Sequence, residues 1–119
     1  MIKLPAIFIG HGSPMNAIET NKFTSEWVKL AAELPKPKAI LCISAHWQTN
    51  HVTEITASEK LTTIYDFGGF PDKLYETEYN PPGDSVLCRH IVNMVNLTPI
   101  RLNYSYGIDH GCWSILKHM

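Results

Sequence analysis

The stretch Ile7-Phe8-Ile9-Gly10-His11-Gly12-Ser13-Pro14 decides the predicted fold, because an apolar run ends there at a histidine held between two glycines. The run from Leu4 to Ile9 hardly alternates between apolar and polar residues, which is typical of a strand covered on both faces in a parallel sheet. Glycine lacks a Cβ, so main chain and ligand can approach closely where such a strand ends. The stretch predicts a central strand ending at a metal or anion site; a tight turn with a solvated histidine is the plainer alternative.

A second apolar run, Ala39 to Ala45, also ends at a histidine, His46. Between the two runs, residues Asn21 to Leu34 carry apolar side chains at three- and four-residue spacing, which predicts an amphipathic helix. Strand, helix and strand make a βαβ unit at the N-terminus, whose crossover is right-handed. Ligands bind at the carboxyl ends of strands in open α/β sheets. His11 and His46 are therefore expected to be neighbours although they are far apart in the sequence.

The rest of the chain predicts further elements of the same domain. An outer or edge strand is expected from Val52 to Ala57, and a strand from Ile100 to Tyr104. A helix capped by Asp84 should reach about Asn96, and another should begin near Trp113. The Gly- and Pro-rich segment 64–83 is expected to be a long ordered loop. The prediction is an α/β fold with a central, mostly parallel sheet and flanking helices, as one domain over residues 1–119.

Composition excludes several classes of partner. Hydrophobic residues make up 45% of the 119 residues, charged residues 18%, and the formal net charge is −1. Such a globular, nearly neutral chain offers no general attraction to nucleic acid or to an anionic membrane. No apolar run approaches the roughly 18 residues of a membrane span, and no signal peptide is recognisable. The three cysteines are odd in number and widely spaced, so we expect reduced thiols in a cytoplasmic protein.

Three histidines lie next to glycines or at strand ends: His11, His46 and His110. Neutral imidazole is the commonest protein ligand for first-row metals, and an open catalytic site often uses three protein ligands. His11 and His46 form the best candidate pair of ligands. His110, which follows Asp109, is a candidate for a third ligand, a general base or a donor to a bound oxyanion.

Several longer stretches match a known family, in family order and over nearly all of the chain. They are Gly10-His11-Gly12-Ser13-Pro14-Met15, Leu34-Pro35-Lys36-Pro37-Lys38-Ala39-Ile40 leading to Ser44-Ala45-His46-Trp47, Tyr65-Asp66-Phe67-Gly68-Gly69-Phe70-Pro71, Tyr79-Asn80-Pro81-Pro82-Gly83 and Asp109-His110-Gly111-Cys112-Trp113. Together they are highly specific. The chain resembles the N-terminal half of the LigB-like extradiol ring-cleavage dioxygenases, in the branch related to aromatic 4,5-DOPA dioxygenases.

The resemblance implies a role for each candidate residue. His11 and His46 match histidines that bind one non-haem divalent metal, Fe(II) for turnover and often Zn(II) as isolated. His110 matches a pocket histidine and is the expected catalytic residue, while Ser13 and Asp66 are the expected substrate contacts. The implied reaction cuts the ring of a small aromatic catechol such as DOPA with O2, the metal holding both reactants while a histidine moves protons.

The resemblance also implies that part of the domain is missing, because family members continue for about as much sequence again. The remaining metal ligands have no match in this chain, so we expect no efficient ring opening by it alone. Half of a sheet exposes apolar surface, which predicts a homo-oligomer. Two alternatives remain open. The first is a small class II chelatase, which shares the length and the opening His-Gly-Ser; the second is a non-catalytic α/β module that binds metal or dimerises.

Overall fold

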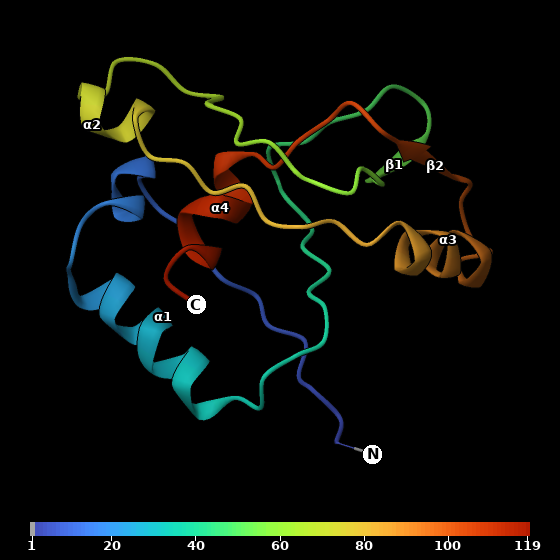
Figure 1. Ribbon diagram of the computed structural model, residues 1–119, viewed down its shortest axis with the longest axis horizontal. Helices are drawn as coiled ribbons and strands as arrows, with labels where there is room; N and C mark the ends of the chain where they lie inside the picture. Colours follow the sequence, from blue (N-terminus) through green and yellow to red (C-terminus); the bar gives the residue numbers. More distant parts are fainter. Residues whose placement is uncertain (1) are drawn as a thin grey trace.

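The computed structural model describes residues 2–119 (Figure 1). In chain order the elements are the 3-10 helix η1 (Pro14–Ala17), α1 (Lys22–Glu33), β1 (Thr53–Thr56), α2 (Asp72–Tyr75), α3 (Ser85–Met94), β2 (Ile100–Asn103) and α4 (His110–Leu116). β1 and β2 pair in parallel, with Thr53 opposite Ile100 and Thr56 opposite Asn103. This arrangement confirms an α/β fold with a parallel sheet and flanking helices. None of the helices described between residues 2 and 119 is long and apolar enough to cross a bilayer.

Both long helices begin where the sequence predicts them, α3 at its predicted cap Asp84 and α1 at Asn21, which the structure shows to be its cap. Asn21 precedes α1, and its side chain accepts hydrogen bonds from the amides of Phe23 and Thr24 at 2.9 and 3.1 Å. Thr24 Oγ1 in turn accepts from the Asn21 amide at 2.9 Å, which completes a capping box. Asp84 caps α3 by accepting from the Leu87 amide at 2.8 Å. These local contacts occupy amides that a helix leaves without a partner in its first turn.

The two N-terminal strands were predicted wrongly. Residues 4–9 and 39–45 are extended, but neither run belongs to a strand, and no backbone hydrogen bond joins either run to another described residue. Neighbouring residues of an extended chain point to opposite sides, and Ile7 and Phe8 are both exposed. Neither face is therefore covered, and a single unpaired strand has no stabilising ladder. The N-terminal βαβ unit is reduced to two extended runs that flank α1.

The hydrophobic core lies among η1, α2 and α4, away from β1, β2 and α3 (Figure 1). Its buried members are Ala17, Leu74, Ile108, Cys112 and Trp113. Trp113 is fully buried, and its indole N–H donates to the Ile64 carbonyl at 2.9 Å. The long loop 64–83 is thus fastened to α4, and it contains the single-turn helix α2, which the sequence did not predict. α4 begins at His110, earlier than predicted, because Asp109 caps it.

Replacing Leu74 with alanine should lower the free energy of unfolding by about 2–5 kcal/mol, because its fully buried side chain would leave a cavity in this core. Urea denaturation followed by tryptophan fluorescence measures the loss. The control is Leu97→Ala, since Leu97 is fully exposed and its truncation should change little. Equal losses in the two variants would contradict the position of the core.

Candidate metal centre

Three histidine side chains meet at one point of the structure. His11 Nε2 and His46 Nε2 lie 2.7 Å apart, as expected from their matching positions at the ends of the two apolar runs. The ring of His110 lies 5.0 Å from that of His11 and 4.2 Å from that of His46, measured between centroids. One ring nitrogen of each residue falls within 4.8 Å of the other two. We call His11, His46 and His110 the histidine cluster.

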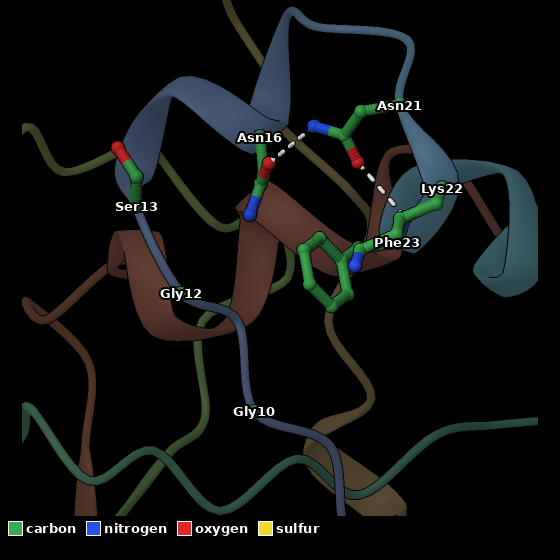
Figure 2. Close-up of a pocket in the computed structure, with 7 residues that line it drawn as sticks. All are labelled: Gly10, Gly12, Ser13, Asn16, Asn21, Lys22 and Phe23. Atoms are coloured by element: carbon green, nitrogen blue, oxygen red, sulfur yellow. Dashed lines mark hydrogen bonds between the residues drawn. The ribbon is translucent and has the colours of Figure 1, made fainter.

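The position of His11 depends on a turn tied to the start of α1. Gly12 has a φ of 65°, in the left-handed region that favours glycine. Asn16 Nδ2 donates to the His11 carbonyl at 2.9 Å, and Asn16 Oδ1 accepts from Asn21 Nδ2 at 2.7 Å. Figure 2 shows this asparagine pair above the glycines. A Cβ on Gly12 would lie 3.0 Å from Asn16 Nδ2, so a side chain there would crowd the Asn16 amide in addition to straining the backbone.

A cavity of about 400 Å³ opens beside this turn. Its walls are formed by Gly10, Gly12, Ser13, Asn16, Asn21, Lys22 and Phe23, and the phenyl ring of Phe23 points toward the glycines (Figure 2). Ser13, an expected substrate contact, lines this cavity. Its hydroxyl oxygen also accepts from the Met15 amide at 3.2 Å and so caps η1. The hydroxyl hydrogen of Ser13 remains available to a ligand.

The position of His46 depends on Asp109, whose side chain is almost fully buried. Asp109 Oδ1 accepts from Ser44 Oγ at 2.6 Å and from the Gly111 amide at 2.9 Å, while Oδ2 accepts from the Tyr106 hydroxyl at 3.0 Å. Ser44 Oγ in turn accepts from the His46 amide at 3.1 Å. Burial, together with the negative charge of Asp109, raises the pKa of Tyr106, so its phenol stays protonated as a donor.

His110 is the first residue of α4, with 5% of its side chain exposed. Both its backbone amide and its ring Nδ1 contact Asp66 Oδ1, at 3.0 and 2.8 Å. Burial opposes ionisation of Asp66, but the hydrogen bonds from His110 outweigh it and lower the pKa of the carboxyl. The sequence singled out Asp66 as a substrate contact and missed its contact with His110. The order Asp109-His110-Gly111 was a local signal for the cap, whereas nothing local linked Asp66 to His110.

The cluster suits a first-row divalent metal. Burial, followed by the nearby His110 and His46, lowers the pKa of His11, which keeps this imidazole neutral near pH 7. Neutral imidazole nitrogens are ligands for zinc and iron, and a metal competes with protons for them. His11 Nδ1 is also buried without a hydrogen-bond partner among residues 2–119. The donor set therefore fits a non-haem metal ion.

Two apolar runs that end in histidines, beside a third histidine at a helix start, define an α/β protein with three imidazoles placed where they could hold a metal ion. Residues 5–119 match the family described as the catalytic LigB subunit of aromatic ring-opening dioxygenase. The chain belongs to this family of non-haem, metal-dependent extradiol dioxygenases.

The chain is similar to proteins named 4,5-DOPA dioxygenase extradiol. That of Escherichia coli strain K12 is 47% identical over 118 residues, which are 98% of this chain and 43% of the relative. Those of Beta vulgaris and Mirabilis jalapa are 38% and 33% identical, each over 94% of this chain and 44% and 43% of their own lengths. The chain thus spans less than half the length of these relatives. The family match does not favour the chelatase or the non-catalytic alternative.

Replacing Gly111 with alanine should weaken zinc binding by about 10–100-fold, the usual effect of disturbing a group that orients a metal ligand. Its Cβ would lie 2.7 Å from Ser44 Oγ and 2.8 Å from His46 Cδ2, so the His46 loop must move away. Competition with a chromophoric chelator measures the affinity. Gly68→Ala is the matched control, because a Cβ there meets no atom within 4 Å. Unchanged affinity in a folded Gly111→Ala protein would contradict this arrangement of the centre.

Proposed function

We propose that the chain is the N-terminal part of an extradiol dioxygenase that opens the ring of a catechol such as DOPA with O2. The observation that carries the proposal is the histidine cluster, formed by residues of three sequence stretches within a chain of the LigB family. The names of the relatives, which match almost the whole chain, support DOPA as the substrate.

In this proposal His11 and His46 hold the metal, which is Fe(II) in the active enzyme, with Zn(II) as the ion often found on isolation. When bound, the metal would supply a template that holds catechol and O2 side by side. His110 acts as the acid and base that moves protons of the catechol hydroxyls, and its ring lies 4.2 Å from that of His46.

Ser13 and Asp66 are proposed as substrate contacts. The Ser13 oxygen is occupied by the Met15 amide, so its hydroxyl would act toward a substrate as a donor. Asp66 uses only Oδ1 for His110, and Oδ2 makes no hydrogen bond to another residue of the described chain. Asp66 Oδ2 therefore suits a hydroxyl or an ammonium group of the substrate, whereas Ser13 suits an oxygen.

Efficient ring opening is expected only when the rest of the family domain is present, because the chain corresponds to 43% of the E. coli relative. The test loads the chain with Fe(II) without oxygen, adds DOPA, admits oxygen and follows the yellow product. The chain alone should turn over far more slowly than the E. coli relative. Addition of the C-terminal part of that relative, which this chain does not match, should restore the yellow product.

Restored activity should depend on this chain's own metal ligands. His11→Ala should abolish it, whereas His90→Ala should not, because His90 is exposed on α3 and outside the histidine cluster. Full turnover by the chain alone would contradict the need for the missing part. Restored activity that survives His11→Ala would contradict the proposed metal centre.

We also propose that the chain associates with a second copy through its uncovered apolar surface. A groove of about 1010 Å³ lies between residues 36–44, β1, β2 and α3, and its apolar walls include Ile40, Ile43, Ile55, Leu87 and Ile91. Contiguous apolar patches of this kind usually find a partner. The groove would then be closed by the same surface of the other copy, as in a symmetric dimer.

Light scattering at micromolar concentration should therefore give at least the mass of a dimer. Ile43→Glu should shift the mass toward the monomer, because Ile43 is 89% exposed and a charge there would have to be buried on association. Lys3→Glu is a control at an exposed residue outside the groove. A monomeric mass for the unmodified chain would contradict association.

A cytoplasmic location also remains a proposal. It is supported by the cysteines, all three of which are free, since thiols persist mainly where the environment is reducing.

A further inference from the structure

The contact between Asp66 and His110 is the most specific polar contact that the proposed roles leave unused. Asp66 lies in the long loop 64–83 and His110 starts α4, so 44 residues separate them. A single oxygen, Oδ1, meets both the backbone amide and the ring Nδ1 of His110. Phe67, the next residue, packs edge-on against the His110 ring at 5.5 Å between centroids. The ring is thus held both in its plane and from one face.

This contact determines which nitrogen of His110 carries hydrogen. A neutral imidazole has one N–H donor and one acceptor nitrogen, and an ionised carboxylate only accepts. Oδ1 of Asp66 already accepts from the His110 amide at 3.0 Å, and an aspartate carboxyl is ordinarily ionised at neutral pH. Nδ1 must then carry the hydrogen and donate it to Asp66, which leaves the lone pair on Nε2. The hydrogen bond made by one ring nitrogen generally sets the state of the other.

We propose that Asp66 is a positioning residue, whose carboxylate fixes the ring orientation of His110 and its Nδ1–H tautomer so that Nε2 carries the lone pair within the histidine cluster. The inference about the tautomer concerns this chain alone. Its consequence for catalysis rests on the proposed ring-opening function.

The consequence is a defined proton acceptor. When a catechol hydroxyl approaches, its proton moves to His110 Nε2 and the electron pair of the O–H bond stays on the catechol oxygen. No electron leaves either group in this step. The imidazolium that forms faces the Asp66 carboxylate at 2.8 Å, which stabilises its positive charge. With the opposite tautomer, Nε2 would carry a hydrogen and could not accept the proton.

Nitrogen-15 NMR of the histidine rings in the metal-free 119-residue chain tests the tautomer directly. At a pH where the ring is neutral, His110 should show a protonated Nδ1 and an unprotonated Nε2. Asp66→Ala should shift the hydrogen to Nε2, whereas Asp66→Asn should keep it on Nδ1, because the amide oxygen also accepts. The control Asp72→Ala, at an exposed residue of α2, should leave the spectrum of His110 unchanged.

An unmodified chain with its hydrogen on Nε2 would overturn the proposal, and this measurement holds even if Asp66→Ala fails to fold. A folded Asp66→Ala chain that keeps the Nδ1–H form would overturn it as well. Because neither result involves DOPA or oxygen, a failure of the proposed function would be recognised separately, as absence of product from the restored enzyme.

Kinetics of the restored enzyme distinguish positioning from substrate contact. Asp66→Ala should lower kcat by about tenfold or more, which is part of the roughly 10²–10⁴-fold that acid–base catalysis contributes, in addition to any rise in KM from the lost substrate contact of Oδ2. Asp66→Asn should recover part of kcat. A raised KM with unchanged kcat would identify Asp66 as a substrate contact alone and overturn its positioning role.

Discussion

The rest of the structure depends on the hydrogen bonds that the buried carboxylate of Asp109 accepts. It caps α4, holds Ser44 and accepts from Tyr106, so it joins the helix start to the loop that carries His46. A buried carboxylate is stable only when its oxygens are satisfied, and these three donors satisfy both of them. α4 also contributes Trp113 to the core. α4 therefore joins the core to the histidine cluster, because His110 and Trp113 lie three residues apart on it, on one face of the helix.

The cluster forms although the strands predicted to carry it do not. In a complete parallel sheet, the carboxyl ends of strands bring such residues together through backbone hydrogen bonds. In this chain, hydrogen bonds from side chains bring the histidines together. Asn16 holds the His11 carbonyl, and Ser44 links the His46 amide to Asp109. The histidine cluster therefore forms in this chain although the runs that lead to His11 and His46 are not paired in a sheet.

Local signals explain which predictions succeeded. α1 and α3 carry their caps, Asn21 and Asp84, next to the apolar pattern, so their boundaries could be found from the sequence. The strands at 53–56 and 100–103 were also found, because each pairs with the other inside this chain. The runs 4–9 and 39–45 have equally strong hydrophobic patterns, but neither pairs with a strand among the described residues. A hydrophobic pattern indicates that a segment should be buried, but it does not identify the strand that pairs with it. The bond from Asp66 to His110 has no sequence pattern at all.

These contacts bear on how the remainder of a family domain would meet this chain. The backbones of His11 and His46 and the ring of His110 are each held by a residue of the same chain, so less ordering is needed when additional ligands arrive. Groups held in place beforehand bind with a smaller loss of conformational entropy. The apolar runs differ, because most of their apolar side chains are exposed and their backbone groups have no backbone hydrogen-bond partner along the described chain. The free energy of joining the two parts should therefore come mainly from covering the apolar runs, while the polar contacts around Asp109, Asn16 and Asp66 already bring the three histidines together.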